Sequence, residues 1–339
     1  MLTIDGSYLE GGGQIVRAAV ALSAVTGTFC RINNIRHGRK RPGLRPQHVT
    51  AIDGVRQCCG ARVDGVVARS EILTFEPGKV APPKRLRLQV GTAGSATLVL
   101  QAVLIPLIAS GQKATVEIQG GTHVNWSPTL EYFREVFGWW LGRMGVLLRL
   151  ESFQAGFYPR GGGHLRMTVE PADLRPLDAT ERGELEENAV WSIASKDLEQ
   201  REVAERQVKG LRQFVDPDRV KVDYVNSSST GTAICAVACF EHSRLGASAL
   251  GKRGKPAEDV GADCGRLLRR RVDSGACIDK HMADQILPYM ALAGSKSRAK
   301  VTEITDHCRT SVWLLHKFLP ARFQIDKSTG LIHCSEGGR

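Results

Sequence analysis

Three apolar segments recur along the chain, and each one ends at a glycine. They cover residues 14–27, 95–111 and 283–294. A glycine directly after an apolar run is a common helix stop, because glycine adopts the left-handed conformation without steric strain. A short run that reads as a strand follows each glycine, at residues 28–35, 113–119 and 299–304. The pattern therefore predicts a helix followed by a strand at three places.

A second helical pattern follows each predicted strand after a loop. These patterns cover residues 45–60, 127–145 and 308–320. The same order of elements thus occurs three times, as in a repeat of about 70 residues. Gly111 and Gly294 are more than twice as far apart in the sequence as Gly27 and Gly111. The excess is the length of a small domain, which predicts an insertion between the second and third copies.

These patterns predict an α+β fold of three repeated βαβα-type units, each an α/β repeat, plus a smaller inserted α/β domain. The large domain is expected to comprise residues 1–180 and 275–339, with copies near 1–80, 81–180 and 275–339. The inserted domain is expected at residues 181–274, where the pattern reads strand, helix, strand, strand, helix. We also expect the three copies to pack helix against helix around a pseudo-threefold axis.

Composition is that of an ordinary globular protein, with 42% hydrophobic residues. The longest apolar stretch, Leu98–Ala109, is too short to span a bilayer. The N-terminal residues lack the basic and then apolar segments of a secretory signal. The nine cysteines include no CxxC pair and no zinc-like spacing, so we expect reduced thiols and a cytoplasmic protein.

The formal net charge of +11 favours binding to polyanions. Basic residues cluster at 36–45, 251–255 and 266–271. A solvated surface explains any one of these clusters about as well as a binding site does. The first cluster carries more weight because it contains glycine and proline and directly precedes a helix, whose N-terminal N–H groups suit phosphate.

One histidine lies where the third copy passes from its strand to its second helix. This residue is His307, and a helix cap or a core position is the ordinary explanation for a lone histidine. The corresponding loops of the other copies are residues 36–45 and 120–128, so the three loops are expected to line one cleft. A neutral imidazole in such a cleft is able to attack phosphorus.

Glycine-rich segments at residues 10–17 and 91–98 each precede a helix and expose backbone N–H groups to an anion. Neither fits the Walker or the dinucleotide-binding pattern, and glycines at helix starts are also common for steric reasons alone. Two carboxylates lie at such helix starts. Glu10 is a candidate ligand of a divalent cation. For Asp284, a favourable interaction with the helix dipole is as good an explanation as a role in the site.

Eight segments, taken in order, resemble the RNA 3′-terminal phosphate cyclases, and most closely the bacterial and archaeal members. They are EGGGQIVR, GRKRPGLRPQH, GTAGSATLVLQ, GGTHVNWSP, GFYPRGGG, GASALGKRGKPAE, HMADQ and ITDH. They span nearly the whole chain, including the predicted insertion. The resemblance implies three repeats, each similar to the C-terminal domain of translation initiation factor three, and a smaller inserted α/β domain.

The resemblance also implies a reaction in three steps that uses ATP and a divalent cation, Mg²⁺ or Mn²⁺. A histidine attacks the α-phosphorus of ATP and expels pyrophosphate, which leaves a covalent adenylate on the enzyme. The AMP then passes to the 3′-terminal phosphate of an RNA. The neighbouring 2′-hydroxyl releases the AMP and closes a 2′,3′-cyclic phosphate.

Carried over residue by residue, the resemblance places the nucleophile at His307 and the metal-binding carboxylate at Glu10. The positions that contact the nucleotide are Gln101, Pro128, His281, Asp284 and Gln285. The positions near the phosphates and the RNA are Arg17, Arg39, Arg41, Gln47 and His48. His281 departs from relatives with a tyrosine against the adenine, and an imidazole stacks there with less area.

Three other functions remain open at this point. A non-catalytic cyclase-like protein that binds RNA and assists ribosome assembly would lack the nucleophile, so His307 argues against it. An enolpyruvyl transferase uses related repeats, but it should show a different repeat number and a site for a small acidic substrate. A general RNA-binding protein explains the charge but not the glycine-rich segments. The physiological RNA and the oligomeric state, monomer or homodimer, also remain open.

Overall fold

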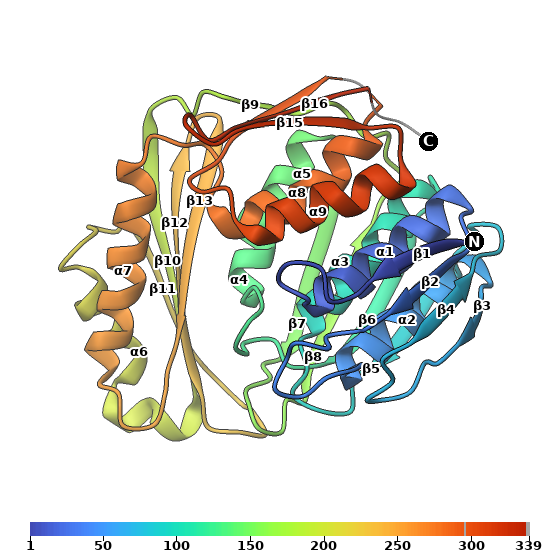
Figure 1. The fold of residues 1–339 in the computed structure, drawn as a ribbon. Coiled ribbons are helices and arrows are strands. Elements are labelled where there is room, and N and C mark those ends of the chain that lie inside the picture. The colour runs from blue at the N-terminus through green and yellow to red at the C-terminus, as the bar shows by residue number, and fades with distance from the viewer. Residues whose placement is uncertain (295, 337–339) are drawn as a thin grey trace.

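The computed structural model describes residues 1–294 and 296–336, and the described part contains four four-stranded sheets (Figure 1). The first unit runs strand, helix, strand, helix, strand, strand. Its elements are β1 (Leu2–Asp5), α1 (Gly13–Thr26), β2 (Cys30–Asn33), α2 (Pro46–Cys59), β3 (Arg62–Asp64) and β4 (Leu73–Glu76). In its sheet, ordered β1-β2-β4-β3, β1 is parallel to β2, and β4 is antiparallel to both of its neighbours.

The second unit repeats this connectivity. Its elements are β5 (Arg85–Gln89), α3 (Ala96–Ala109), β6 (Ala114–Gly120), α4 (Leu130–Tyr132), η1 (Phe133–Phe137), α5 (Gly138–Arg143), β7 (Leu148–Gln154) and β8 (Gly163–Val169). The sheet is ordered β5-β6-β8-β7, with the same strand directions as in the first unit. The second helical pattern is divided here into α4, the π-helical turn η1 and α5, which follow one another without a break.

The third unit has the same connectivity again. Its elements are β9 (Asp178–Ala179), α8 (Lys280–Leu292), β14 (Ser297–Lys300), α9 (Asp306–Phe318), β15 (Arg322–Asp326) and β16 (Leu331–Ser335). The sheet order is β9-β14-β16-β15, with β9 parallel to β14 and β16 antiparallel to both of its neighbours. The strand β9 precedes residue 181, so the third sheet draws one strand from before the predicted insertion and three from after it.

The segment between β9 and α8 forms a sheet of its own, ordered β11-β10-β12-β13. Its elements are β10 (Leu185–Ser195), the 3₁₀ turn η2 (Lys196–Arg201), α6 (Val203–Leu211), β11 (Arg219–Val225), β12 (Thr232–Phe240), β13 (Ser243–Leu250) and α7 (Ala257–Asp273). The sequence pattern missed β13 because its small residues, Gly246, Ala247 and Ser248 among them, give little hydrophobic signal. We propose that residues 181–274 form a separate domain, because they also have their own hydrophobic core.

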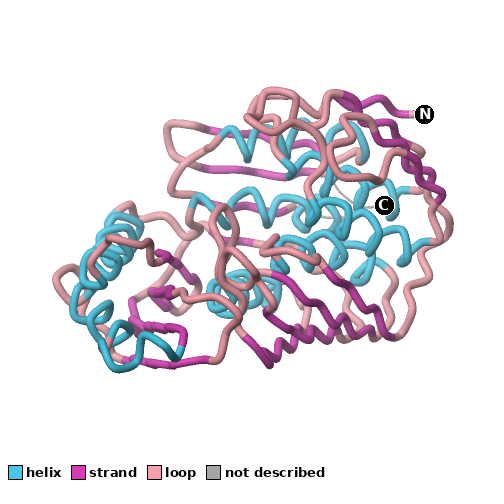
Figure 2. Tube along the Cα trace, turned by 90° about the horizontal axis from the view of Figure 1, so that it is seen from below, coloured by secondary structure: helices cyan, strands magenta, loops and turns pink. Residues whose placement is uncertain are grey.

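The helices of the three repeated units pack against one another inside the large body, and their sheets lie outside (Figure 2). Helix α1 contacts α2, α3 and α9, and α8 contacts α9. One hydrophobic core extends through all three units, and α3 is buried along almost its whole length. This mixed architecture confirms the predicted α+β class, while the likeness of each unit to the initiation-factor domain stays a prediction. None of the helices within the described ranges is long and apolar enough to cross a membrane.

Helix α8 begins at Lys280, before the predicted start at residue 283, because Asp279 caps it. The Asp279 carboxylate accepts hydrogen bonds from two backbone N–H groups of the first turn, at 3.0 and 3.3 Å. It also accepts one from the Tyr132 hydroxyl at 2.8 Å and lies 3.4 Å from a guanidinium nitrogen of Arg271 in α7. Asp279 and Arg271 are both buried. Asp279 therefore connects the start of α8 to the second unit and to the inserted segment.

Candidate functional site

A cavity of about 850 Å³ lies where loops of the first two units meet the start of α9. We call it the central cavity. It is lined by the start of α1, the basic loop before α2, the segments 92–94 and 124–126, and the first turn of α9. Six of the residues predicted for the site line it, namely Glu10, Arg17, Arg39, Gln47, His48 and His307. The packing of the units thus brings together residues that are far apart in the sequence.

His307 lies in the first turn of α9, which is capped by the Thr305 hydroxyl. Its Nδ1 is 2.7 Å from Oε1 of Gln14, and its Nε2 is 3.9 Å from Oε2 of Glu10. An amide oxygen only accepts hydrogen bonds, so Nδ1 of His307 carries the proton and Nε2 keeps its lone pair. The unprotonated nitrogen is therefore the one on the side of Glu10 and the central cavity.

Gln14 holds this histidine from the start of α1. Its amide nitrogen donates to the Ser311 hydroxyl at 2.7 Å, to the Asp284 carboxylate at 3.2 Å and to the carbonyl of His307 at 3.3 Å. The His307 carbonyl only accepts hydrogen bonds, so the amide nitrogen faces this side and the amide oxygen faces the imidazole. The sequence reasoning did not single out Gln14, although a polar residue in the first turn of an otherwise apolar helix is a signal for such a role.

The surroundings of His307 favour the neutral imidazole. Burial lowers the pKa of His307 below 6.5, and the negative charge of Glu10 opposes this shift. The positive charges of Arg39 and Arg17 lower the pKa further. The ring is therefore neutral near pH 7, which is the protonation state that a nucleophile needs.

The position of His307 recurs in the other two units. It is the second helical residue after the cap of α9, and Gln47 and Glu131 hold the same place in α2 and α4. Oε1 of Gln47 accepts a hydrogen bond from the backbone N–H of Ser95 at 2.8 Å. Glu131 is buried and lies 2.8 Å from Nε2 of His123. The same helix position therefore has a different role in each unit. Gln47 joins the first unit to the second, Glu131 forms a buried pair with His123, and His307 faces the central cavity.

Glu10 lies between the histidine and the basic loop. Its carboxylate is 2.9 Å from the Arg39 guanidinium, which also donates to the Glu10 carbonyl at 2.6 Å. Within the described residues, no group of three or more histidine, cysteine or carboxylate side chains is arranged to hold a metal ion. A divalent cation at Glu10 would therefore have one protein carboxylate, with phosphate and water oxygens as its other ligands. Mg²⁺ is commonly bound in this way in enzymes that handle nucleotides.

His48 is a buried residue of the same cavity. Its Nδ1 accepts a hydrogen bond from the backbone N–H of Arg45 at 3.1 Å, so its Nε2 carries the proton. Burial, followed by the positive charges of Arg17, Arg36 and Arg45, holds the pKa of His48 well below 6.5. A Cβ at Gly13 would overlap the imidazole, so only glycine lets the start of α1 approach it. His48 is thus a neutral donor held in a fixed place.

A recess of about 70 Å³ between α1, α3 and α8 contains most of the predicted nucleotide positions. Gln14 and Arg17 line both this recess and the central cavity, and Gln101, Asp284 and Gln285 also line the recess. Burial raises the pKa of Asp284 to about 7, and the charge of Arg17 opposes the shift. Burial lowers the pKa of Arg17 to about 10. Asp284 is therefore protonated more readily than an ordinary aspartate.

Three predicted residues lie elsewhere. Pro128 lines neither cavity, and its carbonyl accepts a hydrogen bond from the Thr97 hydroxyl at 2.9 Å. His281 is exposed at the start of α8 and lines neither cavity. Arg41 lines a neighbouring cavity instead of the central one.

The central cavity also includes residues that the sequence reasoning did not select. Among them are Gln14, Arg36, Arg45, Trp126 and Tyr158. Arg36 and Arg45 belong to the same basic run as Arg39 and Arg41, and of the two arginines selected from that run only Arg39 lines the central cavity. Trp126 and Tyr158 are 98% and 74% exposed, which is unusual for such large aromatic side chains. They give the cavity an aromatic rim.

A neutral histidine, several arginines and helix N-termini around one cavity define a site for a phosphorylated substrate. A family model described as RNA 3′-terminal phosphate cyclase matches residues 8–325. The chain therefore belongs to the RNA 3′-terminal phosphate cyclase family, a family of enzymes. The family resemblance noted in the sequence is confirmed.

Individual relatives give the same result. The RNA 3′-terminal phosphate cyclase of Nitrosospira multiformis is 42% identical over 98% of this chain and 95% of its own length. The protein of the same name from Methanopyrus kandleri is 40% identical, covering 97% and 96%. That from Thermococcus onnurineus is 42% identical, covering 97% of each chain. The similarity thus extends over both the repeated units and the inserted segment.

Proposed function

We propose that this protein converts the 3′-terminal phosphate of an RNA into a 2′,3′-cyclic phosphate in an ATP-dependent reaction, through a covalent adenylate on His307. One observation carries the proposal. Gln14 binds Nδ1 of His307, which leaves the lone pair on Nε2 beside an arginine-lined cavity. Membership of the cyclase family indicates the class of reaction, and the geometry of His307 supports this residue as the nucleophile.

In the first step, Nε2 of His307 attacks the α-phosphorus of ATP. An N–P bond forms, and the bond to pyrophosphate breaks. The proton on Nδ1 stays hydrogen-bonded to Gln14, so the adenylated ring carries a positive charge. That charge makes the imidazole a good leaving group for the next transfer.

In the second step, an oxygen of the RNA 3′-phosphate attacks the phosphorus of the bound AMP. The N–P bond breaks, and the neutral histidine returns. The 2′-hydroxyl then attacks the 3′-phosphorus, AMP leaves, and the hydroxyl proton passes to solvent. Phosphoryl chemistry of this kind depends mainly on positioning and charge neutralisation.

The chain supplies positive charge and donors for these steps. Arg17, Arg36 and Arg39 line the central cavity and would neutralise phosphate oxygens. The N-termini of α1, α2 and α9 add backbone N–H groups. Glu10 would hold Mg²⁺ or Mn²⁺, which neutralises phosphate charge when bound.

The exposed rim suits the end of a single strand. Trp126 and Tyr158 offer aromatic faces on which bases stack with little regard to sequence. Recognition is therefore expected to depend on the terminal phosphate and the 2′-hydroxyl, not on a base sequence. We place this reaction in the cytoplasm, and the nine buried free thiols support that location.

The non-catalytic alternative gains no support from the comparisons, since the relatives reported above are named as cyclases. The enolpyruvyl transferase alternative gains none either, because the matching family model is that of the cyclases.

The proposal is tested by incubating purified protein, freed of bound AMP, with ATP labelled at the α-phosphate and Mg²⁺ or Mn²⁺. A label that survives denaturing electrophoresis, is lost in acid and is stable in alkali identifies a phosphoramidate on histidine. His307→Ala is expected to abolish the label without loss of folded structure. His242→Ala, at an exposed histidine of the inserted segment, serves as the matched control and should label normally. Normal labelling of His307→Ala would overturn the assignment of the nucleophile.

A further inference from the structure

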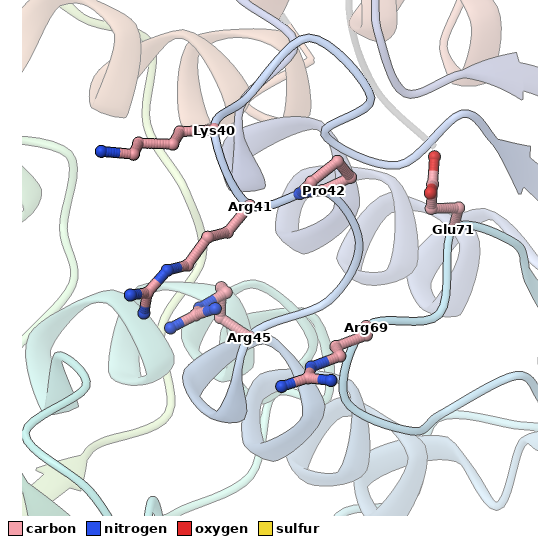
Figure 3. Close-up of a pocket in the computed structure, with 6 residues that line it drawn as sticks. All are labelled: Lys40, Arg41, Pro42, Arg45, Arg69 and Glu71. Atoms are coloured by element: carbon pink, nitrogen blue, oxygen red, sulfur yellow. The ribbon is translucent and has the colours of Figure 1, made fainter.

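A second basic cavity, of about 650 Å³, lies beside the central one (Figure 3). We call it the outer basic cavity. It is lined by Lys40, Arg41, Pro42, Arg45, Arg69 and Glu71. Nothing in the three reaction steps above uses it. The ligand of the outer basic cavity therefore has to be inferred from the residues of that cavity alone.

The outer basic cavity carries uncompensated positive charge. Among the described residues, none of its four cationic side chains forms an ion pair, whereas many surface arginines elsewhere in this protein do. Its one acid, Glu71, lies 2.8 Å from Nδ1 of His37. In Figure 3 the Glu71 carboxylate points away from the guanidinium groups of Arg41, Arg45 and Arg69. Like charges held close together repel one another, and bound anions would relieve that repulsion.

The cavity wall is held in a defined shape. A guanidinium nitrogen of Arg36 donates to the carbonyl oxygens of Arg41 and Gly43, both at 2.8 Å. Gly43 has a φ of 71°, and a Cβ there would overlap the backbone of Arg69. The backbone N–H of Arg69 in turn donates to the Leu44 carbonyl at 2.8 Å. The basic loop and the Arg69 turn are therefore fixed to each other, so the cationic side chains project from a preformed support.

The two cavities are connected through one residue. Arg45 lines both the outer basic cavity and the central cavity. A ligand with a single phosphate would occupy one cavity or the other. A ligand with successive phosphates would be able to occupy both, passing beside Arg45. A nucleic-acid strand has this repeated charge along its backbone.

We propose that the outer basic cavity binds phosphodiester groups of the RNA upstream of the 3′ end, while the terminal phosphate occupies the central cavity. The inference rests on the proposed function and adds to it a preference for longer RNA. Contacts of this kind go to the backbone, so they would position the strand without reading its sequence.

The test compares two substrates in the variant Lys40→Gln/Arg69→Gln. One substrate is an oligonucleotide with a 3′-phosphate, and the other is a nucleoside 3′-monophosphate, which has no upstream phosphodiester. We expect the KM for the oligonucleotide to rise by about 10-fold or more, because each lost phosphate contact weakens binding to the backbone. The KM for the nucleoside 3′-monophosphate is expected to stay within about 2-fold of its value with the unmodified protein.

Salt dependence provides a readout that a merely structural defect would not produce. The slope of log Kd against log salt for oligonucleotide binding, measured without ATP, should become shallower by about 2 in the double variant. Arg85→Gln removes an exposed arginine that lines neither cavity and serves as the matched control. Its slope is expected to change by no more than about 1, which is the contribution of a single phosphate contact.

Three outcomes would overturn the inference. One is an unchanged KM and salt slope for the oligonucleotide in the double variant. Another is an equal rise in KM for both substrates. The third is slower adenylation by ATP alone, which would assign the cavity to the triphosphate of the nucleotide. If the unmodified protein neither adenylates nor cyclises, the proposed function fails, while binding measured without ATP still decides this inference.

Discussion

Nδ1 of His307 lies 2.7 Å from Oε1 of Gln14, across 293 residues of sequence. This contact joins the first helix of the first unit to the second helix of the third. It sets the tautomer of the histidine, because the amide oxygen accepts the proton that Nδ1 carries. Gln14 is therefore a positioning residue for the proposed nucleophile, even though it touches no reacting atom.

Replacement of Gln14 by methionine is the first test of this role. Gln14→Met keeps the length of the side chain but removes the acceptor, so the ring would lose its fixed tautomer and orientation. We expect the single-turnover rate of adenylation to fall by about 10- to 100-fold, by analogy with the groups that orient metal-binding histidines. Nitrogen NMR of the labelled imidazole would report the change of tautomer directly.

Gln14→Glu should recover part of that rate, because a carboxylate also accepts the Nδ1 proton. Its charge stabilises the imidazolium, so the pH at which adenylation is half-maximal should move upward. Gln112→Met, at an exposed glutamine, is the control and should leave the rate unchanged. A Gln14→Met protein with the original rate and tautomer would show that the contact has no such role.

Glu10 is expected to determine the requirement for metal. Glu10→Gln removes the charge that would hold a divalent cation while keeping the shape of the side chain. The concentration of Mg²⁺ or Mn²⁺ that gives half-maximal adenylation should rise by about 10-fold or more, since the proposed site has one protein carboxylate. Titration of the adenylation rate with each metal measures this concentration.

The control for Glu10 is Glu76→Gln, which disrupts another exposed ion pair, the one with Arg62 at 2.9 Å. Its metal titration should match that of the unmodified protein. A metal titration that is the same for Glu10→Gln would remove Glu10 from the proposed metal site.

His48 is expected to make the stability of the fold sensitive to acid. Its pKa in the folded protein lies well below 6.5, the value expected for an unfolded histidine. The unfolded state therefore binds more protons in this range, so the free energy of unfolding falls as the pH drops below 6.5. The slope contributed by His48 is at most about 1.4 kcal/mol per pH unit.

His48→Asn keeps a side-chain acceptor for the Arg45 N–H but does not titrate, so it should flatten this dependence. Urea unfolding at a series of pH values from above 7 to below 6 measures the effect. Burial also lowers the pKa of His307, but His307 is present in both proteins, so the difference between them isolates His48. Identical slopes for the two proteins would refute the prediction.

The repeated helices could be predicted because their signals are local. An apolar run defines α1, a helical pattern defines α2, and Gly27 and Gly60 end the two helices in the left-handed conformation. The start of α8 was placed too late, because the decisive feature is the capping carboxylate of Asp279 and not the apolar run. Motifs also selected His307 and Glu10 as candidate site residues, since their residue types and order resemble a known family, and their roles stay proposals.

The basic loop shows what the sequence could not decide. Arg36, Arg39 and Arg41 look alike in the printed sequence, and the resemblance selected the last two. The fold directs Arg36 and Arg39 to the central cavity and Arg41 to the outer basic cavity. The hydrogen bonds from Arg36 to the loop carbonyls help to fix this division, and they depend on the final path of the backbone.

The sequence by itself thus determined the class of fold, the three helical units and the identity of the family. These depend on apolar periodicity, helix stops and ordered motifs, all of which act over short stretches of chain. Only the tertiary structure decided that Gln14 holds His307 and that Arg45 lies between two cavities. Those relationships arise when helices and loops from separate units pack together, and side-chain direction at such contacts is fixed by the packing, not by the neighbours in sequence.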